Sequence, residues 1–177
     1  MRLEGMNGEA VSVIDNMLST HAVMGTECAH AAAEGRAFMW TADVDLGADK
    51  NLIWLRNNSL VSELIVEYVT LSMSAAAVVE IYVGTGTTPT PGTLVTGVNM
   101  KVGDGGIAPA TCYHTETSVN TGTGLTLLSS HRCGVTAKEV VDYRSALRLK
   151  YYSELAVNIV TDVAGSTANI LGYFIDH

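Results

Sequence analysis

Four side chains in two short segments of this 177-residue chain are of the types that ligate metal ions: Cys112, His114, His131 and Cys133. If the two segments pair as an antiparallel hairpin about the loop at 120–124, the two cysteines lie opposite each other, and so do the two histidines. All four side chains then share one face, because each pair is two residues apart. Two thiolates and two imidazoles can bind zinc. The alternatives are a cross-strand disulfide and half-buried side chains without a ligand. Since zinc ligands usually stand on turns rather than on flat strands, we predict no metal site and no cofactor.

Other patterns typical of catalytic sites are missing from the sequence. A cupin-type metalloenzyme needs a His-x-His pair, a later carboxylate and a further histidine, and the five histidines do not supply this set. The G-x-S-x-G elbow of many serine hydrolases is absent. The glycine runs at 84–88 and 103–106 lack the Lys-Ser/Thr ending of a phosphate-binding loop. Cys28 and His30 lie in an alanine-rich segment and are interpreted as packing residues. We predict that the protein is not an enzyme.

Six tyrosines could form a surface on which a sugar stacks, because tyrosine combines an apolar ring with a polar tip. Most of them lie within alternating segments, where filling the interior of a sheet protein explains them without a ligand. Sugar binding is kept as an alternative on this basis. The six are Tyr82, Tyr113, Tyr143, Tyr151, Tyr152 and Tyr173.

Composition limits the kind of partner. Charged residues make up only 16% of the chain, the formal net charge is −8 and the pI is about 4.9. The ten Lys and Arg residues are scattered singly, which argues against a nucleic-acid partner. No apolar run is long enough for a membrane span, and the acidic N-terminal residues are unlike a secretory signal. Three cysteines, an odd number, fit a reducing compartment, so we expect synthesis in a cytoplasm and no membrane association.

Residues 1–35 differ in pattern from the rest and are expected to form a short irregular or helical N-terminal arm. Ile14, Met17 and Leu18 have helical spacing, and Gly35 is a suitable cap for a second short turn. Helices this short are marginal unless they dock on something. The arm is expected either to lie back on its own sheet or to reach across to a neighbouring subunit.

From residue 36 to 177 the period of the apolar residues is two, as in β-strands. The strand at 51–57 is apolar on both faces and is expected in the interior of a sheet. Between Glu63 and Met73 the apolar set changes sides, which predicts a bulge or a sheet-switching bend near Tyr68–Thr70. The other expected strands cover residues 36–46, 78–84, 94–102, 111–117, 125–133, 140–144, 147–152, 155–161 and 169–175.

This count of strands, with turn signals between them, predicts one all-β domain. It is expected to be an antiparallel β-sandwich of jelly-roll-like form at residues 36–177, joined to the arm at 1–35. The strand count and the lack of a Cys…Trp…Cys pattern favour a jelly roll over an immunoglobulin-like sandwich. No internal repeat is visible.

The ordered succession of the arm, the strand NLIWLRNNS, the strand and loop EIYVGTG and the strand TLVTGVNM resembles the small virion proteins of tailed bacteriophages that decorate or cement capsids. That resemblance implies a protein of the virion, made in the host cytoplasm, whose partners are the major capsid protein and copies of itself, as a homotrimer or another homo-oligomer. A phage tail, baseplate or receptor-binding module that binds carbohydrate is the alternative function.

The predicted mechanism is binding without catalysis. The arm and the loops at 84–93 and 103–110 are expected to contact neighbouring subunits, and many weak contacts on a repeating lattice add up through multivalency. The residues expected at the interface are Ile14, Met17, Leu18, Thr88, Pro89, Thr90 and Pro91.

Overall fold

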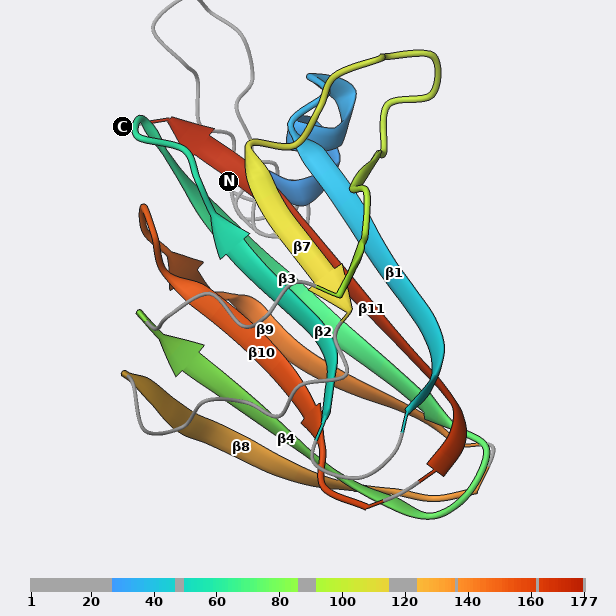
Figure 1. Ribbon diagram of the computed structural model, residues 1–177. Coiled ribbons are helices and arrows are strands. Elements are labelled where there is room, and N and C mark those ends of the chain that lie inside the picture. Colours follow the sequence, from blue (N-terminus) through green and yellow to red (C-terminus); the bar gives the residue numbers. More distant parts are fainter. Residues whose placement is uncertain are drawn as a thin grey trace, which may run out of the picture.

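The computed structural model describes residues 27–46, 50–85, 92–114, 124–135, 137–161 and 163–176. In this part of the chain, eleven strands form two antiparallel sheets that pack face to face, and a helix covers residues 27–33 (Figure 1). The predicted all-β sandwich with a partly helical N-terminal arm is confirmed. The strands are β1 (Ala37–Leu46), β2 (Lys50–Asn57), β3 (Ser62–Met73), β4 (Ala77–Gly84), β5 (Thr93–Leu94), β6 (Val98–Asn99), β7 (Ala110–His114), β8 (Leu125–Cys133), β9 (Lys138–Leu149), β10 (Glu154–Ile159) and β11 (Val163–Asp176).

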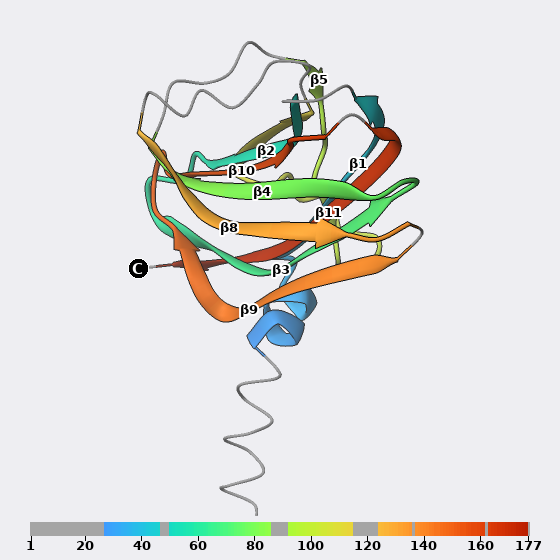
Figure 2. The ribbon, with the colours of Figure 1, turned by 90° about the horizontal axis from the view of Figure 1, so that it is seen from below.

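The order of the strands is that of a jelly roll. The five-stranded sheet has the order β6-β1-β11-β3-β9, and the six-stranded sheet has the order β5-β7-β2-β10-β4-β8. The eight long strands pair from the outside inwards: β1 with β11, β2 with β10, β3 with β9 and β4 with β8. A chain that doubles back in this nested order and then rolls up gives two packed sheets of antiparallel strands. Figure 2 shows the two layers, with the helix against the outer face of the five-stranded sheet.

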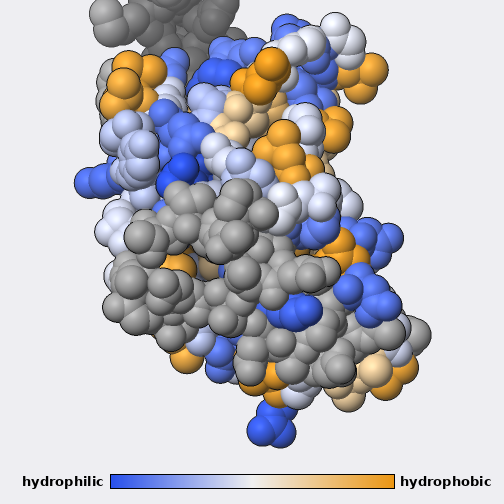
Figure 3. Space-filling model, viewed as in Figure 1, coloured by the Kyte–Doolittle hydropathy of each residue, from blue (hydrophilic) through white to orange (hydrophobic). Residues whose placement is uncertain are grey.

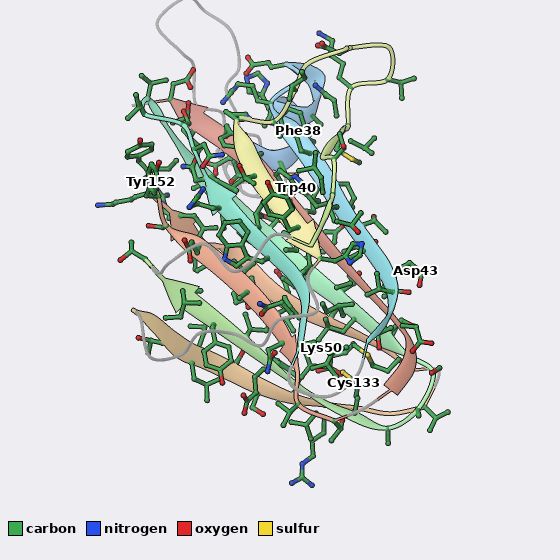
Figure 4. The ribbon with its side chains drawn as sticks, viewed as in Figure 1. Phe38, Trp40, Asp43, Lys50, Cys133 and Tyr152 are labelled. Atoms are coloured by element: carbon green, nitrogen blue, oxygen red, sulfur yellow. The ribbon has the colours of Figure 1, made fainter. Side chains whose placement is uncertain are left out.

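The core lies between the two sheets and is built from the inward-facing residues of each strand. Phe38 and Trp40 extend from β1 into this space (Figure 4), where the ring of Phe38 lies 6.0 Å from that of Trp40 and 5.9 Å from that of Phe174. Strand β2 is buried on both faces, as its sequence predicted. Its Leu55 joins the core, whereas Trp54 is only 1% exposed on the outer face of the six-stranded sheet.

A bulge in β3 explains the change of side in its apolar residues. The register with both neighbouring strands shifts between Val66 and Tyr68, so Glu67 is the extra residue. The inserted residue restores the phase of the strand, so that apolar residues on both sides of the bulge reach the core. The predicted bulge is confirmed slightly before its expected place at Tyr68–Thr70. The alternative of a sheet-switching bend is wrong, because β3 stays in the five-stranded sheet along its whole length. The core residues of β3 are Leu64, Val66, Val69, Leu71 and Met73.

Strand β9 is a single element where the sequence predicted two. Arg144 and Ser145 have φ angles of 48° and 62°, in the left-handed region that residues other than glycine rarely adopt. This pair kinks β9 opposite the bulge of β3, and Ser145 Oγ donates a hydrogen bond of 2.7 Å to Glu67 Oε2. The gap that the sequence suggests between 144 and 147 is therefore a kink within one strand rather than a loop.

Different segments of the chain lie along the two open sides of the sandwich. On one side, the chain passes from β5 in one sheet to β6 in the other and back to β7, and Val95 and Ala108 close the core there. On the other side lie the edge strands β8 and β9. At the two ends, the connections fall into separate groups: the turns at 58–61 and 150–153, the segment 100–109 and the helix are at one end, and the turns at 74–76 and 134–137 are at the other (Figure 1).

Candidate contact surface

The described part of the N-terminal arm packs on its own domain. Ala31 of the helix is buried against Ala37, Ile65 and Tyr173 on the outer face of the five-stranded sheet. The Tyr173 hydroxyl donates a hydrogen bond of 3.0 Å to Glu27 Oε2. Of the two arrangements expected for the arm, residues 27–35 adopt the one in which the arm lies back on its own sheet.

Glycine ends this helix and turns the chain into β1. Gly35 has a φ of 76°, and its amide donates to the carbonyl of Ala32, while the amide of Arg36 donates to the carbonyl of Ala31. The Arg36 guanidinium contacts Glu34 and the carbonyl of Phe174 in the last strand. Its hydrogen bond lowers the pKa of the Glu34 carboxyl. The end of the helix is thereby fixed to both the first and the last strand.

A groove of about 480 Å³ runs between this helix and the sheet. Its wall is mostly apolar, and it includes the half-buried thiol of Cys28. Burial, and to a smaller extent the charge of Glu67, raise the pKa of this thiol, so it is held in the neutral form that suits packing. The prediction that Cys28 is a packing residue fits this environment. The groove is lined by Cys28, Ala29, Ala32, Glu67, Tyr68, Met100, Val140, Asp142 and Leu171.

The segment between β6 and β7 is irregular, as predicted for 103–110, but it is held by its own hydrogen bonds. Asn99 Nδ2 donates 2.9 Å to the carbonyl of Gly35, and Asn99 Oδ1 accepts from the amide of Lys101. Further along, Asp104 Oδ1 accepts from the amide of Gly106 at 3.0 Å. On this framework two apolar side chains face outward: Val102 is 100% exposed and Ile107 is 86% exposed.

The turn between β2 and β3 also exposes apolar side chains on a backbone held by hydrogen bonds. Asn57 is fully buried, and its Oδ1 accepts from the amide of Ser59 at 2.8 Å. Ser59 Oγ in turn accepts from the amides of Val61 and Ser62. Leu60, at the tip of this turn, is 77% exposed, and Val61 beside it is also exposed.

Two tyrosines are exposed at the turn between β9 and β10. The rings of Tyr151 and Tyr152 meet edge to face with centroids 4.4 Å apart. The guanidinium of Arg56 lies 4.8 Å from the centre of the Tyr152 ring. The amide of Tyr152 donates 2.9 Å to the carbonyl of Asn57, so this turn is tied to the neighbouring 58–61 turn.

These side chains share one end of the sandwich, which we call the arm end. Thirteen large hydrophobic side chains are exposed in the described part of the chain, and seven of them are at this end. The opposite end has Val135, which is 59% exposed. Figure 3 shows hydrophobic side chains gathered where the segment between β6 and β7 lies. Apolar groups held on hydrogen-bonded turns are typical of surfaces that contact other proteins. The arm-end residues are Leu60, Val61, Met100, Val102, Ile107, Tyr151 and Tyr152.

The sequence predicted contacts for only one part of the arm end, the loop at 103–110, which contains Ile107. It did not point to Leu60, Val61 or Val102 as contact residues. The predicted interface residues Ile14, Met17, Leu18, Thr88, Pro89, Thr90 and Pro91 all lie outside the described residues. One signal was available: in NNSLVS and in GDGGI, apolar residues stand among turn-forming residues, where no strand or helix can bury them.

The hairpin considered as a condition for a zinc site at the cysteine and histidine segments does not form. Strands β7 and β8 belong to one sheet but are separated in it by β2, β10 and β4. Cys112 pairs with Leu55 and Cys133 pairs with Ala77, so neither cysteine is opposite the other. Both thiols are free and buried in the core, and burial raises the pKa of each. No group of three or more metal-ligating side chains occurs among the described residues.

The six tyrosines are likewise dispersed through the domain rather than gathered on one platform. Tyr82 and Tyr113 flank Trp54 on the outer face of the six-stranded sheet, and Tyr143 packs against the core. Tyr173 lies under the helix. Only the pair at the 150–153 turn belongs to the arm end.

No protein-family model matches this sequence, and no curated protein matches it. No helix in the described part of the chain has the length and apolar character that a membrane span requires.

Proposed function

We propose that the protein is a structural protein of a phage virion that binds and stabilises a capsid lattice without catalysis, as decoration or cement proteins do. Its partners in this proposal are the major capsid protein and copies of itself in a homo-oligomer. The observation that carries the proposal is the arm end, where exposed apolar side chains stand on turns whose backbones are fixed by hydrogen bonds.

The rigidity of these turns supports binding to a preformed surface. A side chain on an ordered turn loses little backbone freedom on association, so more of the burial energy appears as affinity. Full burial of a valine or isoleucine side chain contributes about 1.5–3 kcal/mol. Two or three such contacts per copy give modest affinity, and repetition on a lattice multiplies it.

The low charge of the chain supports the same function. A surface with few Lys and Glu residues is costly to leave in water but easy to pack against a neighbour. The jelly roll supplies a body that holds residues 27–35 and the arm-end turns at one end, so that they meet a repeating surface together.

The experiment uses the full chain and shells assembled from the major capsid protein of the same genome. Cosedimentation and mass photometry measure binding to shells and self-association for the wild type, for the double variant Val102→Ser/Ile107→Ser, and for the control Val135→Ser at the opposite end. We expect the double variant to bind at least about tenfold more weakly, since each tenfold corresponds to about 1.4 kcal/mol. The control should bind as the wild type does. Equal binding by all three would remove the basis of the proposal.

A second function, sugar binding by a tail or receptor-binding module, is favoured by one observation. Tyr151 and Tyr152 are exposed together at a turn tip, which is where such modules place the rings that stack on sugars. A glycan array tests this function, with Tyr151→Ala as the comparison. Signals that vanish in the variant would support a receptor-binding module, and an array without signals would dismiss it.

A further inference from the structure

A chain of polar side chains crosses the open side of the sandwich between the edge strands β8 and β9. Ser129 and His131 are two residues apart on β8, so their side chains share one face of the strand. The Oγ of Ser129 lies 2.9 Å from Nε2 of His131. The other ring nitrogen, Nδ1, lies 3.5 Å from Oε1 of Glu139, which comes from β9.

This is the connectivity of a serine nucleophile, a general base and an orienting carboxylate. One ring nitrogen of the histidine lies near the hydroxyl and the other near the carboxylate. A carboxylate in this position favours a proton on Nδ1, which leaves Nε2 to accept the serine proton. Ser129 and His131 are both partly exposed.

A fourth side chain lies beside the serine. Tyr143 of β9 packs against the core, and its buried hydroxyl has no hydrogen-bond partner of good geometry among the described residues. Burial raises the pKa of this phenol to about 12, although the neighbouring Ser129 hydroxyl acts to lower it. The phenol is therefore neutral near pH 7, with a proton to donate to a developing oxyanion.

We propose that Ser129, His131 and Glu139 form a nucleophilic site that takes small activated carboxylic esters, with Tyr143 as the hydrogen-bond donor to the ester carbonyl oxygen. This activity is separate from lattice binding and does not depend on it.

The reaction balances with water as the second reactant. Ser129 Oγ forms a bond to the ester carbonyl carbon while its proton passes to Nε2 of His131. The bond from that carbon to the leaving oxygen breaks, and the leaving group takes the proton from His131. Water then attacks the acyl-serine, His131 accepts its proton and returns it to Ser129 Oγ, and the carboxylic acid is released.

The chain contains its own matched control, because the adjacent Ser130 is exposed and faces the other side of β8. The probes are p-nitrophenyl acetate, followed by release of nitrophenol, and a fluorophosphonate, followed by peptide mapping. In the wild type and in Ser130→Ala we expect nitrophenol release above the rate in buffer. We also expect the phosphonate label on the peptide that contains Ser129. In Ser129→Ala both signals should be lost.

His131→Gln should also lose the reaction while retaining the fold, which circular dichroism and the melting temperature check. Reaction in Ser129→Ala equal to that of the wild type would overturn the proposal, as would an unlabelled wild type.

Glu139 is a positioning residue in this site, and its role is tested separately by Glu139→Gln. Removing the carboxylate beside Nδ1 should lower kcat for p-nitrophenyl acetate while KM stays unchanged, because only the orientation of His131 is lost. An unchanged kcat in a variant whose melting temperature falls would show a merely structural role and would overturn this assignment.

Discussion

Replacing Asn57 by alanine should destabilise the domain more than almost any other change of a polar residue. The side chain is completely buried at the arm end. Its Nδ2 donates 2.9 Å to the carbonyl of Ser62 and 2.9 Å to the carbonyl of Leu149, and its Oδ1 accepts 2.8 Å from the amide of Ser59. One amide group thus joins the end of β2 to the start of β3 and the end of β9.

The magnitude follows from these three bonds. A hydrogen bond contributes about 1 kcal/mol net, and a buried polar group left without a partner costs about 1–3 kcal/mol. Asn57→Ala removes three bonds and leaves two carbonyls and one amide at a buried site. We expect a loss of about 3 kcal/mol in the free energy of unfolding. For a domain of this size, this lowers the melting temperature by about 6–12 °C.

Urea unfolding followed by tryptophan fluorescence measures the loss, with an unchanged slope showing that the two end states are the same. The neighbouring Asn58 is the matched control. It is exposed, and among the described residues its side chain bonds Arg56 and Thr111, so Asn58→Ala should cost less than about 1 kcal/mol. Equal losses in the two variants, or a loss below 1 kcal/mol for Asn57→Ala, would refute the reasoning.

Three further predictions concern other parts of the fold. A Cβ at Gly172 would lie 2.8 Å from a carbonyl oxygen of β3, so Gly172→Ala should cost about 1–3 kcal/mol in urea unfolding, whereas Gly105→Ala, with open space around it, should be neutral. Burial raises the pKa of the Cys112 thiol above 9.0, so the unfolded chain loses this proton at lower pH than the folded chain does. The free energy of unfolding should therefore fall as pH rises above about 9, and less steeply in Cys112→Ala; parallel curves would contradict this. Tyr173→Phe removes the hydroxyl that bonds the helix and the β9 kink, so hydrogen exchange of the amides in 27–33 should quicken, and unchanged rates would count against the contact.

Much of the fold could be predicted from the sequence, because side-chain period reports directly which face a residue occupies. The alternation from Phe38 onward identified β1 and its inward side. The two apolar faces of 51–57 identified an interior strand. The change of side within β3 required a bulge or a sheet-switching bend, and a bulge occurs at Glu67. Each of these inferences depends only on local geometry.

Strand partners could not be predicted in the same way. Period two says nothing about which strand lies next to which, so the sequence left a hairpin of Cys112 and Cys133 open, a possibility that required successive strands to pair. In the jelly roll, pairing joins strands far apart in sequence, and three strands stand between β7 and β8. The contact between His131 and Glu139 depends on the turn that carries the chain from one sheet to the other, which no spacing in the sequence reveals.

The pairing of the first long strand with the last has a consequence for biogenesis. Strand β1 borders β11, and the helix of the arm rests on Tyr173 of that strand. Arg36 also contacts the carbonyl of Phe174. A nascent chain that has been made only as far as β10 lacks these contacts, so the helix cannot dock until β11 has been synthesised. The topology therefore delays docking of the helix beside the arm-end turns until the last strand of the sandwich is in place.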